Sequence, residues 1–510
     1  MFIFCYLFLI SSNCMLQAQS ADKLKIELPD ERKNTIMTKV TNVTKPHRVQ
    51  LVNDQGTYFL AHSSPNKIYH YSNSLKYKAS QRLVTNITQG TLDYVNLDNS
   101  IHRISYRQKK GLLEFCAQQL GNTSLTLSKE KIIHTLNKKQ AINALGSFVK
   151  NSDDQSKMVL INQHFKKGDG KTERQVDISV YDSNYKKLWH ISNAPLIYTS
   201  VRFLPDYTIT PSISNDGKTV VLSYQEKVKG KALEKFTVIF TEENPAGIPL
   251  PITPPNNMKV NRDLSQQTTK INEGINTITH TAIFEHKEQI LQLKEFDATT
   301  GNVILDKTII LDPDFCRKNA AGKKINVPTN GVVIGNAITT PYHIMSSHRT
   351  TDGGYLYTLE PYANAHYFPT TTNPATEDKI TQRNVFTSTT VLVYRFDKEG
   401  NIMWKKKLNK TFNGYNTTNN YAGHTSMLVG ENLYVFYYDH GKENNPRQHN
   451  RIGKGRSMLV KLNKQGEIHE EKLFEDSTND VHISPEYSYL TEDNKLHIYN
   501  KYGIIKIYFE

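Results

Sequence analysis

The sequence predicts an all-β protein, and within this class a β-propeller, most simply one with seven blades of four antiparallel strands. Short apolar stretches that alternate with polar residues recur along the 510 residues, and tight turns ending in glycine separate them. They group into units of about 40–55 residues, the length of a four-stranded propeller blade. Aromatic residues make up 10% of the chain, and no helix-period segment follows residue 20, which also favours strands. Six or eight blades are the alternatives.

The unit is clearest between residues 389 and 474. Two hairpins there turn at Asp397–Gly400 and Asn463–Gly466, each opening on a polar residue and closing on glycine. Glycine adopts the positive φ that such turns need. Comparable units are expected near residues 46–88, 90–136, 147–192, 208–240, 289–311, 331–408 and 421–474, with three strands left over at 481–510.

The first 18 residues form an uncharged apolar run that is short for a membrane span and is followed by small and polar residues. We predict a signal peptide (residues 1–18), and therefore a secreted, periplasmic or outer-surface protein without a transmembrane segment in the mature chain. An uncleaved anchor and a lipoprotein attached through Cys14 are alternatives. Cys116 lies in an alternating run and is expected to be a buried strand residue rather than a disulfide partner of Cys316.

Residues 19–45 are predicted to be an N-terminal extension, and residues 46–510 the propeller. The stretch Lys23–Leu28 could supply the fourth strand that the last unit lacks and so close the ring. The segment Asn244–Thr269 holds five prolines, which cannot donate to a strand ladder, so it is expected to be a surface excursion. A linker between two domains is the alternative.

Connection lengths divide the two faces of the predicted disc. The turns within hairpins are short, whereas residues 165–174, 227–234, 361–384 and 439–456 form long, polar connections. The long connections hold an excess of Lys and Arg, in a chain whose net charge is +14, together with aromatic residues. Function tends to lie on elaborated loops, so this face is predicted to bind an anionic glycan or an acidic protein surface. The candidate ligand-binding residues are Tyr362, His366, Tyr367, His440, Arg447, His449, Arg451, Lys454 and Arg456. Solvated loops without a ligand are the alternative.

The usual catalytic and metal motifs are absent from the sequence. It has no H-E-x-x-H, C-x-x-C or G-x-S-x-G, and Gly170-Lys171-Thr172 lacks the glycine of a P-loop, because Phe165 stands in its place. We therefore predict a monomeric, non-catalytic binding module with no metal, no cofactor and no nucleic-acid partner. Two alternatives stay open: a polysaccharide-acting enzyme with carboxylates near the central channel, since glycosidase acids have no local motif, and a structural component of an envelope assembly.

Two resemblances agree with this fold. The segments FDATTGNVILDK and YRFDKEGNIMWKKKL resemble the outer hairpins of quinoprotein-type propellers, in which a tryptophan docks on the next blade. Trp404 and Trp189 occupy that position, while Leu305 and Ile468 replace it elsewhere, and no quinone cofactor is implied. The segments GGYLYTLEPY, DKEGNIMWKKKLNK and ENLYVFYYDHGKEN resemble uncharacterised secreted propeller proteins of Bacteroidota-type bacteria, a resemblance that implies no activity.

Overall fold

The computed structural model describes most of the chain between residues 24 and 509. The described residues are 24–27, 47–53, 55–61, 67–72, 77–82, 89–137, 144–167, 172–196, 209–227, 233–251, 266–272, 275–285, 289–312, 315, 332–333, 338–339, 343–360, 363–368, 383–415, 423–439, 456–475, 488–490, 496–500 and 503–509.

The strands of the first half follow one another in sheets of four. Sheet 1 holds β2 (His47–Asn53), β3 (Gly56–Ala61), β4 (Lys67–Tyr71) and β5 (Tyr77–Arg82); sheet 2 holds β6 (Gln89–Leu97), β7 (Ser100–Lys109), β8 (Leu112–Gln119) and β9 (Lys131–Leu136). Sheet 3 holds β10 (Ala144–Asn151), β11 (Lys157–Lys167), β12 (Thr172–Asp182) and β13 (Lys187–Pro195); sheet 4 holds β14 (Thr210–Ile213), β15 (Thr219–Lys227), β16 (Leu233–Thr241) and β17 (Ile248–Pro249).

The second half keeps this order, with one larger sheet. Sheet 5 holds β18 (Gln266–Asn272), β19 (Thr277–Glu285), β20 (Gln289–Asp297) and β21 (Val303–Leu311). Sheet 6 holds β22 (Val332–Val333), β23 (Ile338–Thr339), β24 (His343–Arg349), β25 (Tyr355–Glu360), β26 (Ala363–Phe368), β27 (Arg383–Phe396) and β28 (Ile402–Tyr415). Sheet 7 holds β29 (His424–Val429), β30 (Asn432–Asp439), β31 (Arg456–Leu462) and β32 (Ile468–Glu475); sheet 8 holds β33 (Ser488–Leu490), β34 (Leu496–Asn500), β35 (Gly503–Phe509) and β1 (Leu24–Glu27).

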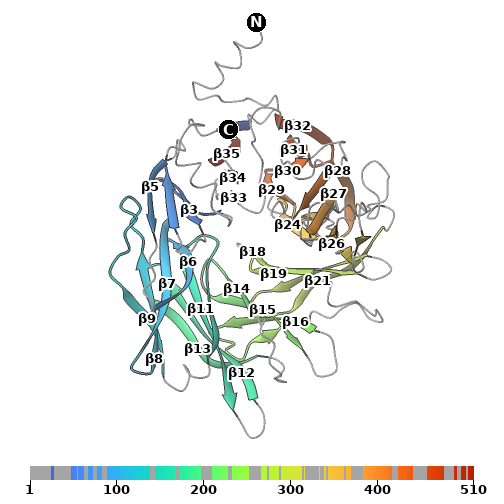
Figure 1. Cartoon of the computed structure of the whole chain (residues 1–510). Helices are drawn as coiled ribbons and strands as arrows, with labels where there is room; N and C mark the ends of the chain where they lie inside the picture. Colours follow the sequence, from blue (N-terminus) through green and yellow to red (C-terminus); the bar gives the residue numbers. More distant parts are fainter. Residues whose placement is uncertain are drawn as a thin grey trace.

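The sheets stand in a ring (Figure 1). Sheets 2 to 7 contact one another in chain order through β6, β10, β14, β18, β24 and β29, and β2 of sheet 1 contacts both β7 of sheet 2 and β33 and β34 of sheet 8. β1 pairs antiparallel with β35, so a strand from the start of the chain is the fourth strand of the last sheet. The predicted domain boundaries at residues 18 and 45 lie outside the described residues and stay predictions.

The all-β class and the propeller built from four-stranded antiparallel sheets are confirmed. Seven sheets have four strands each, and sheet 6 brings the total to eight, one of the numbers that the sequence left open. Sheet 6 is larger because β27 and β28 are 14 residues long and because β26, within the connection 361–384 that was expected to be a loop, pairs with β27. The proline-rich segment also begins with a strand, since β17 pairs with β16 at the sheet edge, where proline is tolerated.

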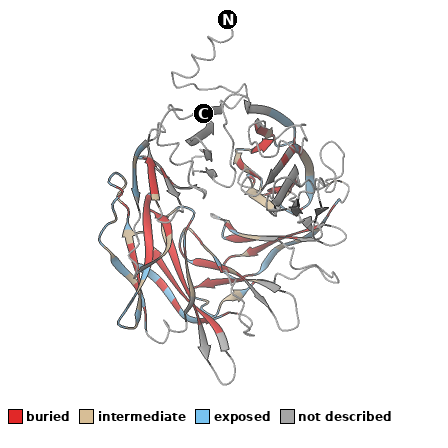
Figure 2. Cartoon of the chain, in the orientation of Figure 1, coloured by how far each residue is buried: buried red, intermediate tan, exposed pale blue. Residues whose placement is uncertain are grey.

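The hydrophobic core lies between neighbouring sheets. Strand β11 shows why: Met158 and Leu160 pack in the cluster shared with sheet 2, whereas Val159 and Ile161 pack in the cluster shared with sheet 4. Successive side chains of a strand point to opposite faces, so a sheet apolar on both faces joins two neighbours. Each fully buried aliphatic side chain stabilises this stack by about 1.5–3 kcal/mol. Figure 2 shows buried residues along the strands of the ring.

The two tryptophans tie outer strands to the turn of the next sheet. Trp404 on β28 donates its indole N–H to the carbonyl of Lys464 at 2.9 Å, and Trp189 on β13 donates to the carbonyl of Gly217 at 2.7 Å. Gly466 lies against the Trp404 ring with φ +77°, and a Cβ atom there would come within 2.8 Å of the indole. The glycine of this turn is therefore required both by its backbone conformation and by the docking of the ring.

A buried ion network joins sheets 6 and 7. The side chains of Glu360 on β25, Lys410 on β28 and His424 on β29 are all completely buried. The Lys410 ammonium contacts one Glu360 oxygen and donates to the carbonyl of Gly423 at 2.5 Å, and His424 Nδ1 lies 2.6 Å from the other Glu360 oxygen. Burial acts to raise the pKa of Glu360, but Lys410 and His424 outweigh it and hold this pKa at about 2.

Two further expectations can be compared with the structure. Cys116 is a fully buried, unpaired residue of β8, as predicted, while Cys316 lies outside the described residues. Among the residues with described positions, no helix has the length and apolar character needed to cross a membrane.

Candidate functional site

The residues that the sequence proposed as ligand-binding fall largely outside the described part of the chain. Tyr362, His440, Arg447, His449, Arg451 and Lys454 are not described. His366 and Tyr367 belong to β26, where they stand opposite Asn384 and Arg383 of β27, and Arg456 begins β31 opposite Asp439. The structure thus gives the strand positions of three of these residues, and their role in binding stays a prediction.

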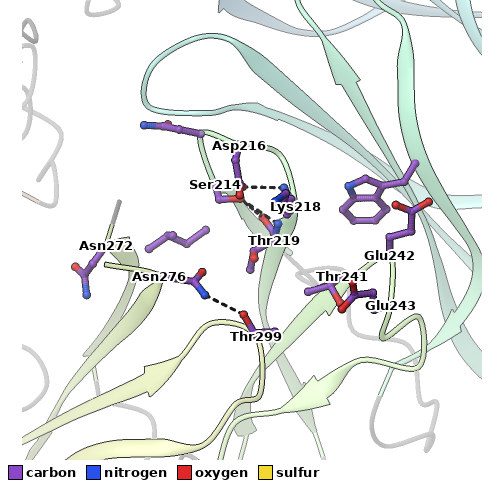
Figure 3. A pocket seen from close by; sticks show the side chains of 13 residues that line it. Ser214, Asp216, Lys218, Thr219, Thr241, Glu242, Glu243, Asn272, Asn276 and Thr299 are labelled. Atoms are coloured by element: carbon purple, nitrogen blue, oxygen red, sulfur yellow. Dashed lines mark hydrogen bonds between the residues drawn. The ribbon is translucent and has the colours of Figure 1, made fainter. Parts of the chain in front are cut away.

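A cleft of about 740 Å³ lies instead where sheets 4 and 5 meet beside β13 (Figure 3). It is lined by the β14–β15 turn, by the residues that follow β16, by the β18–β19 turn and by Thr299 in the β20–β21 turn. All these connections join the first strand of a sheet to the second, or the third to the fourth. This hollow, the turn-face cleft, therefore opens on the face of short turns and not on the face of long basic connections.

The β14–β15 turn forms one wall and is fixed by its own side chains. Ser214 donates its hydroxyl proton to Asp216 Oδ1 at 2.6 Å, and the same oxygen accepts the backbone N–H of Lys218 at 2.9 Å. Gly217 follows with φ +74°, a conformation that favours glycine. Asp216 thereby turns the chain, a usual role of Asp in tight turns, while its side chain remains exposed at the cleft.

Amide and hydroxyl groups of sheet 5 form the opposite wall. Asn276 has φ +50° and donates from Nδ2 to the Thr299 hydroxyl at 2.9 Å. Asn272 donates from Nδ2 to the hydroxyls of Thr277 at 3.0 Å and Thr279 at 2.7 Å. These bonds hold the amide groups in place, and each hydroxyl or amide oxygen keeps further hydrogen-bonding capacity.

Among the residues that the structure describes, two apolar side chains line the cleft, Trp189 and Ile271, and each is 7% exposed. Trp189 is held by its hydrogen bond to Gly217, which forms part of the first wall. A site for an apolar ligand would be lined predominantly by hydrophobic and aromatic side chains. Most of the described side chains that line the turn-face cleft can instead form hydrogen bonds.

Charge in the cleft is negative, although the whole chain is basic. Asp216, Glu242 and Glu243 face it together with Lys218, and all four are exposed (Figure 3). Within the described residues, Glu242, Glu243 and the Lys218 ammonium make no ion pair or hydrogen bond, so they are free to contact a ligand. The excess of carboxylates disfavours an anionic group in this cleft.

No metal site is formed by the part of the chain that the structure describes, since no group of three or more His, Cys, Asp or Glu side chains there could hold an ion. What the cleft can supply is a set of hydrogen-bond donors and acceptors on fixed turns. Sequence patterns gave no sign of it, because its residues come from short turns that have the composition of ordinary hairpins.

Comparisons with known proteins complete the description. No protein-family model matches the sequence, and no curated protein matches it. Among solved structures, the chain is similar to hydrazine synthase of Kuenenia stuttgartiensis, with 11% identity, a TM-score of 0.35 and coverage of 84% of this chain and 97% of the other. It is similar to an oligogalacturonate lyase of Vibrio parahaemolyticus, with 10% identity, a TM-score of 0.34 and coverage of 96% of this chain and 95% of the other. It is also similar to an ulvan lyase of polysaccharide lyase family PL25, with 9% identity, a TM-score of 0.32 and coverage of 91% of this chain and 93% of the other. These values are low, and the fold is established by the strand order of this chain.

Proposed function

We propose that this protein is a glycan-binding β-propeller that holds a saccharide in the turn-face cleft without turning it over. One observation carries the proposal: most of the described residues that line a cleft of about 740 Å³, within the usual size of ligand sites, carry hydroxyl, amide or carboxylate groups. Saccharide hydroxyls can donate to Glu242 and Glu243 and exchange hydrogen bonds with Asn276 and Thr299. The predicted signal peptide agrees with a protein that meets such ligands outside the cell.

Calorimetric titration with a panel of neutral oligosaccharides tests this proposal. The double variant Glu243→Ala with Thr299→Ala removes two exposed cleft groups, and we expect it to weaken binding at least tenfold. Glu399→Ala is the matched control, because Glu399 is an exposed residue of a hairpin turn on the same face that does not line the cleft. Equal affinity of the double variant and the control, or no binding by any neutral saccharide, would refute the proposal.

A polysaccharide-acting enzyme is the second candidate. Three exposed carboxylates, Asp216, Glu242 and Glu243, line one cleft, and paired carboxylates are the groups that most glycosidases use. Release of new reducing ends from a bound polysaccharide, abolished by Glu242→Gln or Glu243→Gln, would establish turnover. Binding without product formation would leave the non-catalytic role. The long basic connections remain a proposed second contact for an anionic partner.

A further inference from the structure

A small pocket lies between sheets 5 and 6, on the opposite face of sheet 5 from the turn-face cleft. The alternation along β18 separates the two hollows: Ile271 packs in the cluster shared with sheet 4, so the neighbouring Lys270 points towards sheet 6. Strands β18 and β24 are edge strands of their sheets and border the middle of the ring (Figure 1). The pocket, here called the inner pocket, has a volume of about 20 Å³, which admits one or two water-sized groups.

A hydrogen bond between the second strands of the two sheets closes the inner pocket on the side away from the middle of the ring. Tyr357 on β25 and Thr281 on β19 both line the pocket and are almost completely buried, and their hydroxyl oxygens lie 2.8 Å apart. On β24, His348 Nε2 lies 2.8 Å from a serine hydroxyl of sheet 7, so its neighbours Ser347 and Arg349 point towards sheet 5. Side chains of both sheets therefore form the walls of the pocket.

Two cations line the inner pocket, and one of them has a counter-ion among the described residues. Arg349 donates from Nη1 to Glu295 Oε1 at 2.9 Å and to the Tyr355 hydroxyl at 2.5 Å. Lys270 is exposed and makes no hydrogen bond or ion pair with any residue that the structure describes. Burial, assisted by the charge of Lys270, lowers the pKa of His348 to about 4, so this imidazole is neutral near pH 7. The described groups thus leave one positive charge in excess at the pocket.

Hydroxyl groups add neutral donors beside these charges. Thr268 on β18 and Ser347 on β24 line the pocket, and neither side chain makes a hydrogen bond within the described part of the chain. Each hydroxyl has one proton to donate, the Lys270 ammonium has three, and Arg349 keeps N–H groups beyond those of Nη1. No Asp or Glu is among the described residues that line the pocket. Free donors therefore face the pocket from two walls, and no carboxylate there competes for them.

We infer that the inner pocket binds one small monovalent anion, a carboxylate group or a halide ion, between Lys270 on one wall and Ser347 and Arg349 on the other. This site is separate from the turn-face cleft and goes beyond the proposed glycan binding. The single excess charge matches a monovalent anion, and the volume of about 20 Å³ is too small for the four oxygens of a tetrahedral anion such as sulfate. Hydrogen bonds from charged donors are the stronger ones, so Lys270 is expected to contribute most to binding.

Saturation-transfer NMR with sodium formate, the smallest carboxylate, tests this inference at constant ionic strength. We expect the native protein to transfer saturation to the formate proton, and Lys270→Gln to reduce this signal at least fivefold. Lys150→Gln is the matched control and should keep the native signal. Lys150 is also an exposed lysine without a partner among the described residues, and it lies on β10, the first strand of sheet 3, away from the inner pocket. Circular dichroism of Lys270→Gln checks that an exposed substitution has left the fold intact.

Competing anions then define the site, with the ionic strength held constant by a large organic sulfonate. Displacement of formate by sodium chloride assigns the pocket to halides as well as carboxylates, and a signal that persists in chloride assigns it to carboxylates alone. Sodium sulfate should leave the signal in place, because sulfate does not fit. If the native protein and Lys270→Gln give equal signals, or if sulfate removes the signal, formate is held by the general positive charge of the chain and the inference is wrong. Either result leaves the turn-face cleft untouched.

Discussion

Removing the charge of Glu360 should destabilise the protein far more than removing the charge of a surface carboxylate. In Glu360→Gln the Lys410 ammonium stays fully buried without its counter-ion, and the His424 ring loses its carboxylate partner. Breaking a buried pair from one side costs about 3–5 kcal/mol. The surface pair of Lys405 with Asp312 has a similar geometry at 3.0 Å, but its side chains are 35% and 48% exposed, so Asp312→Asn should cost no more than about 1 kcal/mol.

The difference of about 2–4 kcal/mol is measurable by urea unfolding at pH 7, because the midpoint shifts while the slope stays constant. Combining Glu360→Gln with Lys410→Met removes the uncompensated charge, so the double variant should recover part of the loss. A positive coupling energy in this double-mutant cycle reports the pair itself. If Glu360→Gln costs no more than Asp312→Asn, the network is not a buried ion pair and the reasoning is wrong.

Two further predictions concern acid and the end of the chain. Burial lowers the pKa of His102 to about 4, below the value of about 6.5 in the unfolded chain. As the pH is lowered from about 6.5 to 4, the unfolded state therefore binds the proton first, and the free energy of unfolding decreases by about 3 kcal/mol in all. His102→Gln should remove that part of the acid-induced loss in thermal melts, whereas a substitution of the exposed His469 should not. Lys25→Pro and Ile26→Pro test the pairing of β1 with β35. The backbone N–H groups of neighbouring residues in an edge strand point alternately to the partner strand and to solvent, and proline has no N–H. One variant should therefore lower the melting temperature and the other should not. Equal effects of the two would contradict the pairing.

The strands were predictable because their signals are local. Alternating residues and glycine-ended turns gave the four strands of sheet 3 within residues 147–192, and the structure extends them by a few residues at their ends. Sheet 6 was less predictable, since β26 is a short strand that pairs with the long arm of β27. Neither its composition nor its position in a connection distinguishes it from a loop.

The candidate site was not predictable from the sequence, because it depends on contacts between distant residues. Trp189 meets Gly217 across 28 positions, and Asn276 meets Thr299 across 23. The buried network is more distant still, with 64 positions between Glu360 and His424. Loop length and charge can be seen in a sequence, and they directed the prediction to the long basic connections. Which turns converge is determined by the packing of one sheet on the next.

The short turns have a physical advantage as a binding surface. A ligand that meets Asp216 or Asn276 meets groups already fixed by hydrogen bonds within their turns, so little conformational entropy is lost on binding. A long flexible loop in any protein has to order many residues to offer comparable contacts, at about 1–2 kcal/mol for each backbone unit fixed. Weak polar contacts can therefore give useful affinity on the turn face.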